Sequence, residues 1–325
     1  MKGGEWLAVA IQSVVSGVAA SLLCLAYGPQ EAPAGWLAVA AAGPWPGALV
    51  QARLGDGGAT DVLVLHGWPV DAALLAWAQP LLGTAAWVTA GHAFWVMAGG
   101  CAAAWLARRW WGGVAPGLVT GLAWQRAGIP VLEHAADWSG GPFAWAVLPF
   151  AFGLLDAACA SGRPGVAVAA GLAAASLAML RGDSPWWLLI VGATLVASRA
   201  ALGHGRRAVG AGLLATGTAM LAALPVRGWV QGRLADPVAL DPVAPSLVLG
   251  LVALLGAWVA RDRPKLAAIP ALLVLYGTLS VPGDVGVTSA LGLSLLAGAV
   301  GSATIRRTAR PVAATSNSGG SSVNA

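Results

Sequence analysis

Ten apolar runs, each close to the length needed to cross a lipid bilayer, dominate this sequence. A transmembrane helix needs about 20 consecutive apolar residues, within a range near 17–25. Because hydrocarbon offers no hydrogen-bond partners, a run that crosses it is expected to be helical. The runs lie near residues 6–27, 84–107, 113–129, 142–160, 164–180, 185–202, 208–226, 245–260, 265–282 and 287–305. The sequence therefore predicts an all-α, polytopic integral membrane protein, a bundle of about ten transmembrane helices.

The charge content supports this interpretation and excludes one class of partner. Only 10% of the residues are charged, whereas a soluble domain carries about 25%. A chain with so few charges could not cover its own surface in water, so we expect the lipid bilayer to surround most of it. The net charge of +5 comes from short basic clusters between apolar runs rather than from one basic face. That distribution argues against nucleic acid as a partner.

The loops between the runs alternate in charge, and this alternation predicts an orientation. With the N-terminus placed in the cytoplasm, thirteen of the eighteen Lys and Arg residues fall on the inside and ten of the thirteen acidic residues on the outside. The positive-inside rule places Lys and Arg in cytoplasmic loops. We therefore predict a multi-pass membrane protein with both termini in the cytoplasm. The high Ala, Gly and Arg content is typical of a bacterial source with GC-rich DNA, so we expect the membrane to be the bacterial cytoplasmic (inner) membrane.

The first loop, residues 28–83, is the longest. It contains two apolar pieces, 35–50 and 71–82, that are too short or too interrupted by proline to span the bilayer. We interpret them as interfacial or re-entrant helices of a large outer loop, with one extra pair of spans as the alternative. The transmembrane domain then covers residues 1–310. Residues 311–325 are small and polar and are predicted to form a disordered cytoplasmic tail.

The large outer loop also carries polar residues that could support catalysis. Glycines on both sides of Asp56 permit a tight backbone path that brings its carboxylate to the membrane surface, and Asp61 and His66 follow closely. Carboxylates at such a surface could act as a general base or hold a divalent cation. The alternative is a solvated loop in which Gly-Asp-Gly is a turn.

Further candidates lie in the next two outer loops. The second loop carries the polar residues Glu133, His134 and Asp137. Arg126 and Arg181 interest us because they lie on the side that the positive-inside rule depletes of arginine. A guanidinium there is a good phosphate ligand. The alternative is an arginine that extends from a helix end to the interface or pairs with a neighbouring acid, as Arg181 could with Asp183.

Inside the predicted spans, ionisable residues are scarce. His92 lies within the second run and Asp156 near the inner end of the fourth. An ionisable group at membrane depth is by default a candidate for function. A series of Asp, Glu or His side chains through the bilayer, which proton-coupled transport would need, is missing from the runs. Proton-coupled transport is therefore disfavoured.

The order of these parts resembles the polytopic glycosyltransferases of the GT-C fold class and their uncharacterised bacterial relatives. An N-in first helix leads into an outer loop with aspartates and a second helix that ends in Trp105-Leu-Ala-Arg108-Arg109. A Gly/Ala-rich helix at 113–128, an outer loop with Glu133-His134 and the segment Trp145-Ala-Val-Leu-Pro149 follow. The resemblance covers about residues 1–200 and is one of layout. It implies a GT-C-like N-terminal half.

The resemblance also implies a function. In this class the first outer loop carries an essential acidic residue, and the donor is usually a sugar on a polyprenyl phosphate. Asp56 or Asp61 would then be catalytic, Glu133 or Asp137 a second carboxylate, and Arg126 or Arg181 the ligand of the lipid phosphate. His66 and His134 are further candidates on the acceptor side. The implied activity is sugar transfer to an acceptor on the outer face of the membrane. The alternative is a non-catalytic scaffold subunit or a small-molecule permease, so whether the chain is an enzyme stays open at this point.

Overall fold

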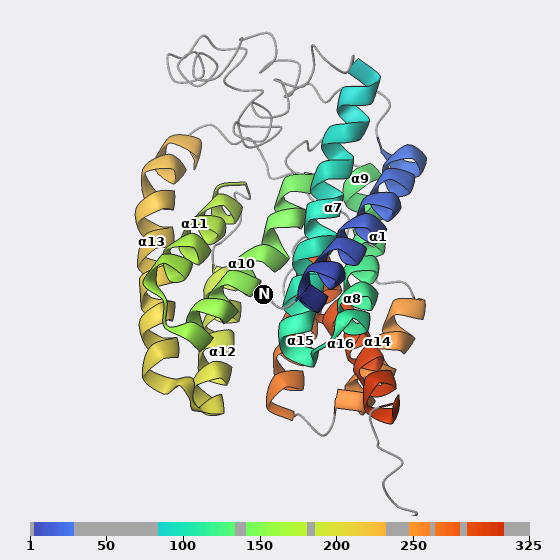
Figure 1. The fold of residues 1–325 in the computed structure, drawn as a ribbon. Coiled ribbons are helices and arrows are strands. Elements are labelled where there is room, and N and C mark those ends of the chain that lie inside the picture. The colour runs from blue at the N-terminus through green and yellow to red at the C-terminus, as the bar shows by residue number, and fades with distance from the viewer. Residues whose placement is uncertain are drawn as a thin grey trace, which may run out of the picture.

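The computed structural model describes residues 3–28, 84–133, 141–180, 186–231, 247–260, 264–279 and 285–308, and these residues are almost entirely helical (Figure 1). The helices are α1 (Gly3–Tyr27), α7 (Thr84–Trp111), α8 (Val114–Ala127), α9 (Ile129–Glu133), α10 (Gly141–Ser161), α11 (Pro164–Leu180), α12 (Trp186–Arg199), the π-helical η1 (Ala200–His204), α13 (Gly205–Gln231), α14 (Leu247–Val259), α15 (Pro264–Leu279) and α16 (Val285–Thr308). The described part of the chain contains no strand. The all-α prediction is therefore confirmed for these residues.

Each of the ten predicted spans overlaps a helix of this series, but not one for one: the run at 113–129 covers α8 and the start of α9, and the run at 185–202 covers α12 and part of η1. Three segments have both the length and the apolar composition to cross a membrane: Glu5–Tyr27, Thr89–Trp111 and Gly141–Ser161. Shorter apolar segments occur in α11, α14 and α16. Three helices of the described part are therefore long and apolar enough to cross a membrane, which indicates a helical membrane protein. The predicted outer-loop helices within 28–83 and the predicted tail 311–325 lie outside the described residues.

The helices form two groups that meet where α7 packs against α10 (Figure 1). One group contains α10, α11, α12 and α13; the other contains α1, α7, α8, α9, α14, α15 and α16. In the second group α8 is central, because α7, α16 and α1 all pack against it. The turn Gly112–Gly113, where both φ angles are positive (77° and 81°), reverses the chain between α7 and α8. The end of α7 and the start of α8 therefore lie at the same end of the bundle.

Glycine permits the closest helix contacts around α8. A Cβ atom on Gly121 would lie 2.8 Å from the Gly100 carbonyl oxygen of α7, and one on Gly301 of α16 would lie 2.7 Å from the Pro116 nitrogen. Lipid tails are as apolar as leucine side chains, so helix association in a bilayer depends on close packing and on polar contacts rather than on the hydrophobic effect. Small residues at these crossings allow the backbones to approach.

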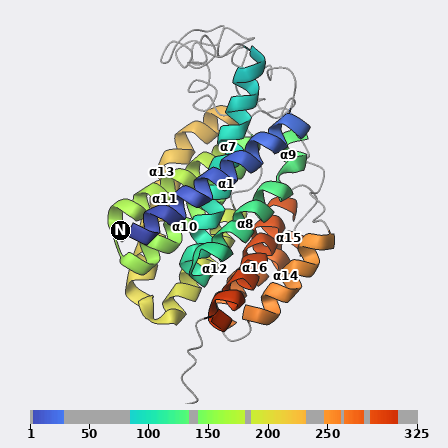
Figure 2. The same cartoon turned by 45° about the vertical axis from the view of Figure 1, so that its right-hand side comes forward.

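Helix α1 crosses the outside of the bundle obliquely (Figure 2). Its buried residues recur at every fourth position: Ala8, Gln12, Ser16, Ala20 and Cys24. Large apolar side chains cover the rest of its surface, and Val14 and Leu25 are each 66% exposed. This narrow buried stripe with a wide apolar surface is the pattern expected of a peripheral helix in lipid.

Candidate functional site

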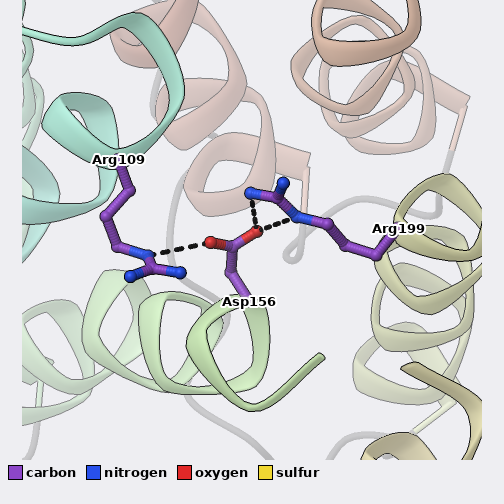
Figure 3. Close-up of polar contacts among 3 residues, drawn as sticks. All are labelled: Arg109, Asp156 and Arg199. Atoms are coloured by element: carbon purple, nitrogen blue, oxygen red, sulfur yellow. Dashed lines mark hydrogen bonds and ion pairs between the residues drawn. The ribbon is translucent and has the colours of Figure 1, made fainter. Parts of the chain in front are cut away.

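Three helix ends meet around a buried carboxylate at one end of the bundle (Figure 3). Asp156 of α10 is fully buried and accepts hydrogen bonds from two guanidinium groups. Arg109 of α7 donates from Nε to one carboxylate oxygen over 2.9 Å. Arg199 of α12 donates to the other oxygen from Nε over 2.6 Å and from Nη2 over 2.5 Å. We call these three residues the Asp156 cluster, and the end of the bundle that contains them the arginine end.

The charge balance of the Asp156 cluster explains how an acid is tolerated at this depth. Burying a carboxylate without a partner would cost roughly several kcal/mol of desolvation free energy. Two arginines at its rim, with side chains 30% and 12% exposed, compensate that charge and leave the cluster at +1. Asp156, which the sequence marked only as an ionisable group inside a span, is therefore paired across three helices. The two ion pairs are sufficient to explain a buried carboxylate at this position.

A second polar group lies between α1, α7 and α8. The Gln125 amide of α8 donates from Nε2 to the Ser16 carbonyl oxygen over 3.0 Å and to the Val96 carbonyl oxygen over 3.2 Å. Arg108 at the end of α7 donates from Nη1 to Gln12 Oε1 over 3.3 Å. We call Gln12, Ser16, Arg108 and Gln125 the Gln125 cluster.

The Gln125 cluster is buried and only partly satisfied. Gln12 and Gln125 are 5% and 1% exposed, and among the described residues Gln12 Nε2 and Gln125 Oε1 have no hydrogen-bond partner. Sequence analysis did not single out either glutamine, because it looked for charged groups. An amide within an apolar run would have been the available signal. His92, the predicted intramembrane histidine, is fully buried within α7.

The end of the bundle opposite the arginine end is closed by the short helix α9. The chain turns at Gly128, whose N–H donates hydrogen bonds to the carbonyl oxygens of Trp124 and Gln125 over 3.2 and 3.1 Å. A Cβ atom on Gly128 would lie 2.7 Å from Trp145 Nε1, so glycine is needed for this close approach. Ile129, Val131 and Leu132 are buried, and α9 packs against α1, α8 and α10. We call this the α9 end.

Two of the predicted site residues are at the α9 end. Arg126 lies in the last turn of α8 and Glu133 is the last residue of α9, and both are exposed. Neither makes an ion pair with another residue of the described part of the chain. The buried side of α9 fixes the backbone that carries Glu133, so the two charged groups are held on one end of the bundle by packed segments.

The remaining predicted site residues lie outside the described residues. These are Asp56, Asp61, His66, His134, Asp137 and Arg181. Their convergence on Arg126 and Glu133 therefore stays a prediction. Within the described ranges, no group of three or more His, Cys, Asp or Glu side chains is arranged to hold a metal ion.

The sequence matches no model of a known protein family, and no curated protein matches it. The function is therefore argued from the residues and their arrangement.

Proposed function

We propose that this protein is a membrane glycosyltransferase that moves a sugar from a polyprenyl-phosphate donor to an acceptor at the outer face of the cytoplasmic membrane. The observation that carries the proposal is the α9 end, where an exposed guanidinium and an exposed carboxylate project from packed helices. A lipid-linked donor needs a cation for its phosphate and a carboxylate near the acceptor. Arg126 and Glu133 are residues of these two types, and both are among the candidates that the sequence-based resemblance implies, beside Arg181 and Asp137.

In this proposal all ten helices cross the membrane, with the arginine end in the cytoplasm and both termini inside. Two observations support that orientation. The basic residues of the chain are concentrated in the loops that this topology places inside. Arg109 and Arg199, predicted to lie on the inner side, are brought together by one carboxylate at one end of the bundle. Because the chain reverses at Gly112–Gly113, this orientation has Arg126 on the outer side.

The proposed reaction is a displacement at the anomeric carbon of the donor sugar. A carboxylate, Asp56 or Asp61, takes the proton of the acceptor hydroxyl as its oxygen attacks that carbon. The bond between the anomeric carbon and the phosphate oxygen breaks, and polyprenyl phosphate leaves with the electron pair. Arg126, with Arg181, stabilises the negative charge of the leaving phosphate. Glu133 or Asp137 would orient the acceptor, with His66 and His134 nearby, and these carboxylates could also hold a divalent cation.

The experiment is a turnover assay with purified protein in proteoliposomes that contain a polyprenyl-phosphate-linked hexose. Release of free polyprenyl phosphate is followed by mass spectrometry, with and without a membrane extract as the acceptor source. We expect Arg126→Gln to lower release about 100-fold, because a lost donor to a developing charge costs about that much. Asp56→Asn and Asp61→Asn, tested singly, identify the base. Arg307→Gln, which removes a charge near the end of α16, is the matched control and should leave release unchanged.

A protein that releases no polyprenyl phosphate, and that co-purifies only with ordinary phospholipids in native mass spectrometry, contradicts the transferase proposal. That result would favour the scaffold or the permease.

The permease has one specific observation in its favour, the Gln125 cluster. A solute path needs polar side chains within the bundle, and Gln12 and Gln125 each present a buried polar atom without a described partner. A thermal-stability screen against amino acids, sugars and nucleosides tests this alternative. A shift seen with one solute and lost in Gln125→Leu would favour a permease; the absence of any shift would remove its support.

A further inference from the structure

Three exposed arginines at the arginine end are separate from the Asp156 cluster. Arg163 lies in the turn between α10 and α11, and Arg206 and Arg207 lie in the first turn of α13. We call these three residues the basic cluster. None of them makes an ion pair with a described carboxylate; the ion pairs of the described residues join Asp156 to Arg109 and Arg199. The cluster therefore adds three uncompensated positive charges to the +1 of the Asp156 cluster.

Small residues bring the two parts of the basic cluster together. Cys159 of α10 contacts the Ala208 carbonyl oxygen of α13 through Sγ over 3.7 Å, and both residues are fully buried. The chain then turns at Gly162, where φ is 69°. A Cβ atom on Gly162 would lie 3.4 Å from Cγ and Cδ of Arg207. The Arg207 side chain therefore lies along the turn that carries Arg163.

The turns around the basic cluster leave open space. Cβ atoms built on Gly165, Gly203 and Gly205 would meet no atom within 4 Å. Gly165 lies two residues after Arg163, Gly205 directly precedes Arg206, and Gly203 lies three residues before Arg206. Gly203 has φ 97°, a conformation that a residue with a side chain rarely adopts. The space beside these three glycines is therefore open to a ligand.

The helix surfaces next to the basic cluster are apolar and exposed. On α13, Val209 lies three residues after Arg206 and Leu213 lies four residues after Val209, which places the three residues on one face of the helix. They are 48% and 71% exposed. On α11, Val168 and Leu172 are exposed in the same way. The arginines at the helix ends are therefore followed, along both helices, by exposed apolar side chains.

We propose that the basic cluster binds the phosphate headgroup of an anionic membrane lipid, such as phosphatidylglycerol, whose acyl chains lie along α11 and α13. A free phosphate would satisfy the arginines alone, whereas a lipid also covers Val209, Leu213 and Leu172. Basic residues at a cytoplasmic membrane surface attract anionic headgroups in this way. The proposed site lies at the opposite end of the bundle from the proposed transferase site, and its lipid is a bound partner rather than the sugar donor.

The test is native mass spectrometry of the full-length protein, titrated with phosphatidylglycerol and, separately, with phosphatidylcholine. The triple variant Arg163→Gln, Arg206→Gln, Arg207→Gln removes the basic cluster. Each arginine is expected to contribute about fivefold to affinity, so the triple variant should bind phosphatidylglycerol about 100-fold more weakly. The matched control removes three positive charges from the predicted outer side, through Arg53→Gln, Arg227→Gln and Arg233→Gln, and should bind as the wild type does.

Two single variants of α13 keep the test valid if the triple variant does not fold. Arg207→Gln and Arg227→Gln remove the same charge from opposite ends of the same helix. Only Arg207→Gln should weaken phosphatidylglycerol binding, by about fivefold.

A competition with inorganic phosphate separates the two sources of the phosphate group. Binding of phosphatidylglycerol that survives millimolar inorganic phosphate, with little binding of phosphatidylcholine, supports the lipid site. Equal binding of the two lipids, equal binding by Arg207→Gln and wild type, or full displacement by inorganic phosphate would overturn it. None of these readings depends on sugar transfer, so the site and the proposed transferase activity can fail independently.

Discussion

The Asp156 cluster and the Gln125 cluster both join helices through buried polar side chains, but they do so differently. In the Asp156 cluster, at the end of the bundle, both carboxylate oxygens are paired with guanidinium groups that are partly exposed. In the Gln125 cluster, two glutamine amides are almost fully buried and each keeps one atom without a described partner. The Asp156 cluster contains full charges, and both of its carboxylate oxygens are paired. The Gln125 cluster is mostly neutral, and two of its polar atoms have no described partner.

The difference follows from the charge of the group that each cluster buries. A carboxylate far from water needs paired cations to offset its desolvation, and an arginine near a helix end can keep part of its guanidinium in the polar interface. A neutral amide costs less to bury, so it tolerates an unmade hydrogen bond. The free energy of unfolding should therefore depend more on the Asp156 cluster than on the Gln125 cluster.

The largest effect is expected from Asp156→Ala. Removing the carboxylate leaves two guanidinium groups facing each other, and breaking a buried pair in this way costs about 3–5 kcal/mol of unfolding free energy. SDS titration in bicelles measures that loss. Changing Arg109, Asp156 and Arg199 together to leucine removes the charges along with the pairing and should restore most of the stability. If Asp156→Ala were as stable as the wild type, the Asp156 cluster would not stabilise the packing of its three helices.

A smaller loss is expected from Gly100→Ala, which disturbs the Gln125 cluster by packing. The added Cβ atom would lie 2.6 Å from Cδ and Nε2 of Gln125, so the amide must leave its carbonyl partners. Overpacking of this kind costs about 1–3 kcal/mol. Gly210→Ala is the matched control, because its Cβ atom meets nothing within 4 Å. That control should be neutral or slightly stabilising in the same SDS titration, since alanine favours a helix over glycine.

Gln125→Leu is expected to cost less again. The two carbonyl groups that it leaves, on Ser16 and Val96, lie within α1 and α7 and keep their helical environment. Hydrogen bonds between transmembrane helices contribute about 0.6 kcal/mol on average, with a maximum near 1.7. A loss as large as that of Asp156→Ala, measured by the same titration, would contradict the distinction between the two clusters.

The smallest effect should separate the two arginines of the Asp156 cluster. Arg199 makes two contacts and has a side chain 12% exposed, whereas Arg109 makes one contact and is 30% exposed. Water screens the more exposed pair, so Arg109→Gln should cost about 1 kcal/mol or less, and Arg199→Gln more. The reverse order of unfolding free energies would show that exposure does not govern the cluster.

Most of the helices could be predicted from the sequence, because hydrophobic length alone identifies a span. The run at 164–180 coincides with α11. Differences appear where local chemistry intervenes. Helix α7 was predicted to end at 107 but continues to Trp111, since arginines are favourable in a last turn. The run at 113–129 was predicted as one span, but the chain turns at Gly128 and forms α9.

The polar clusters were less predictable than the helices. Asp156 was visible as an acid inside a span, but its partners lie 47 and 43 residues away and depend on how three helices pack. Gln12 and Gln125 carry no charge and were not singled out. Of the predicted site residues, the described part of the chain contains Arg126 and Glu133, which share the α9 end. The proposed roles of the others remain predictions from sequence.

Both proposals depend on the sidedness of the two ends, and cysteine labelling in intact cells tests it most directly. Cys101 is changed to alanine, while Cys24 and Cys159 are buried and can stay. Arg126→Cys places a thiol at the α9 end, and Ser161→Cys places one at the arginine end; both positions are exposed. The account predicts that a membrane-impermeant maleimide labels position 126 in intact cells and position 161 only after permeabilisation. Labelling of 161 from outside, with 126 protected, would contradict it.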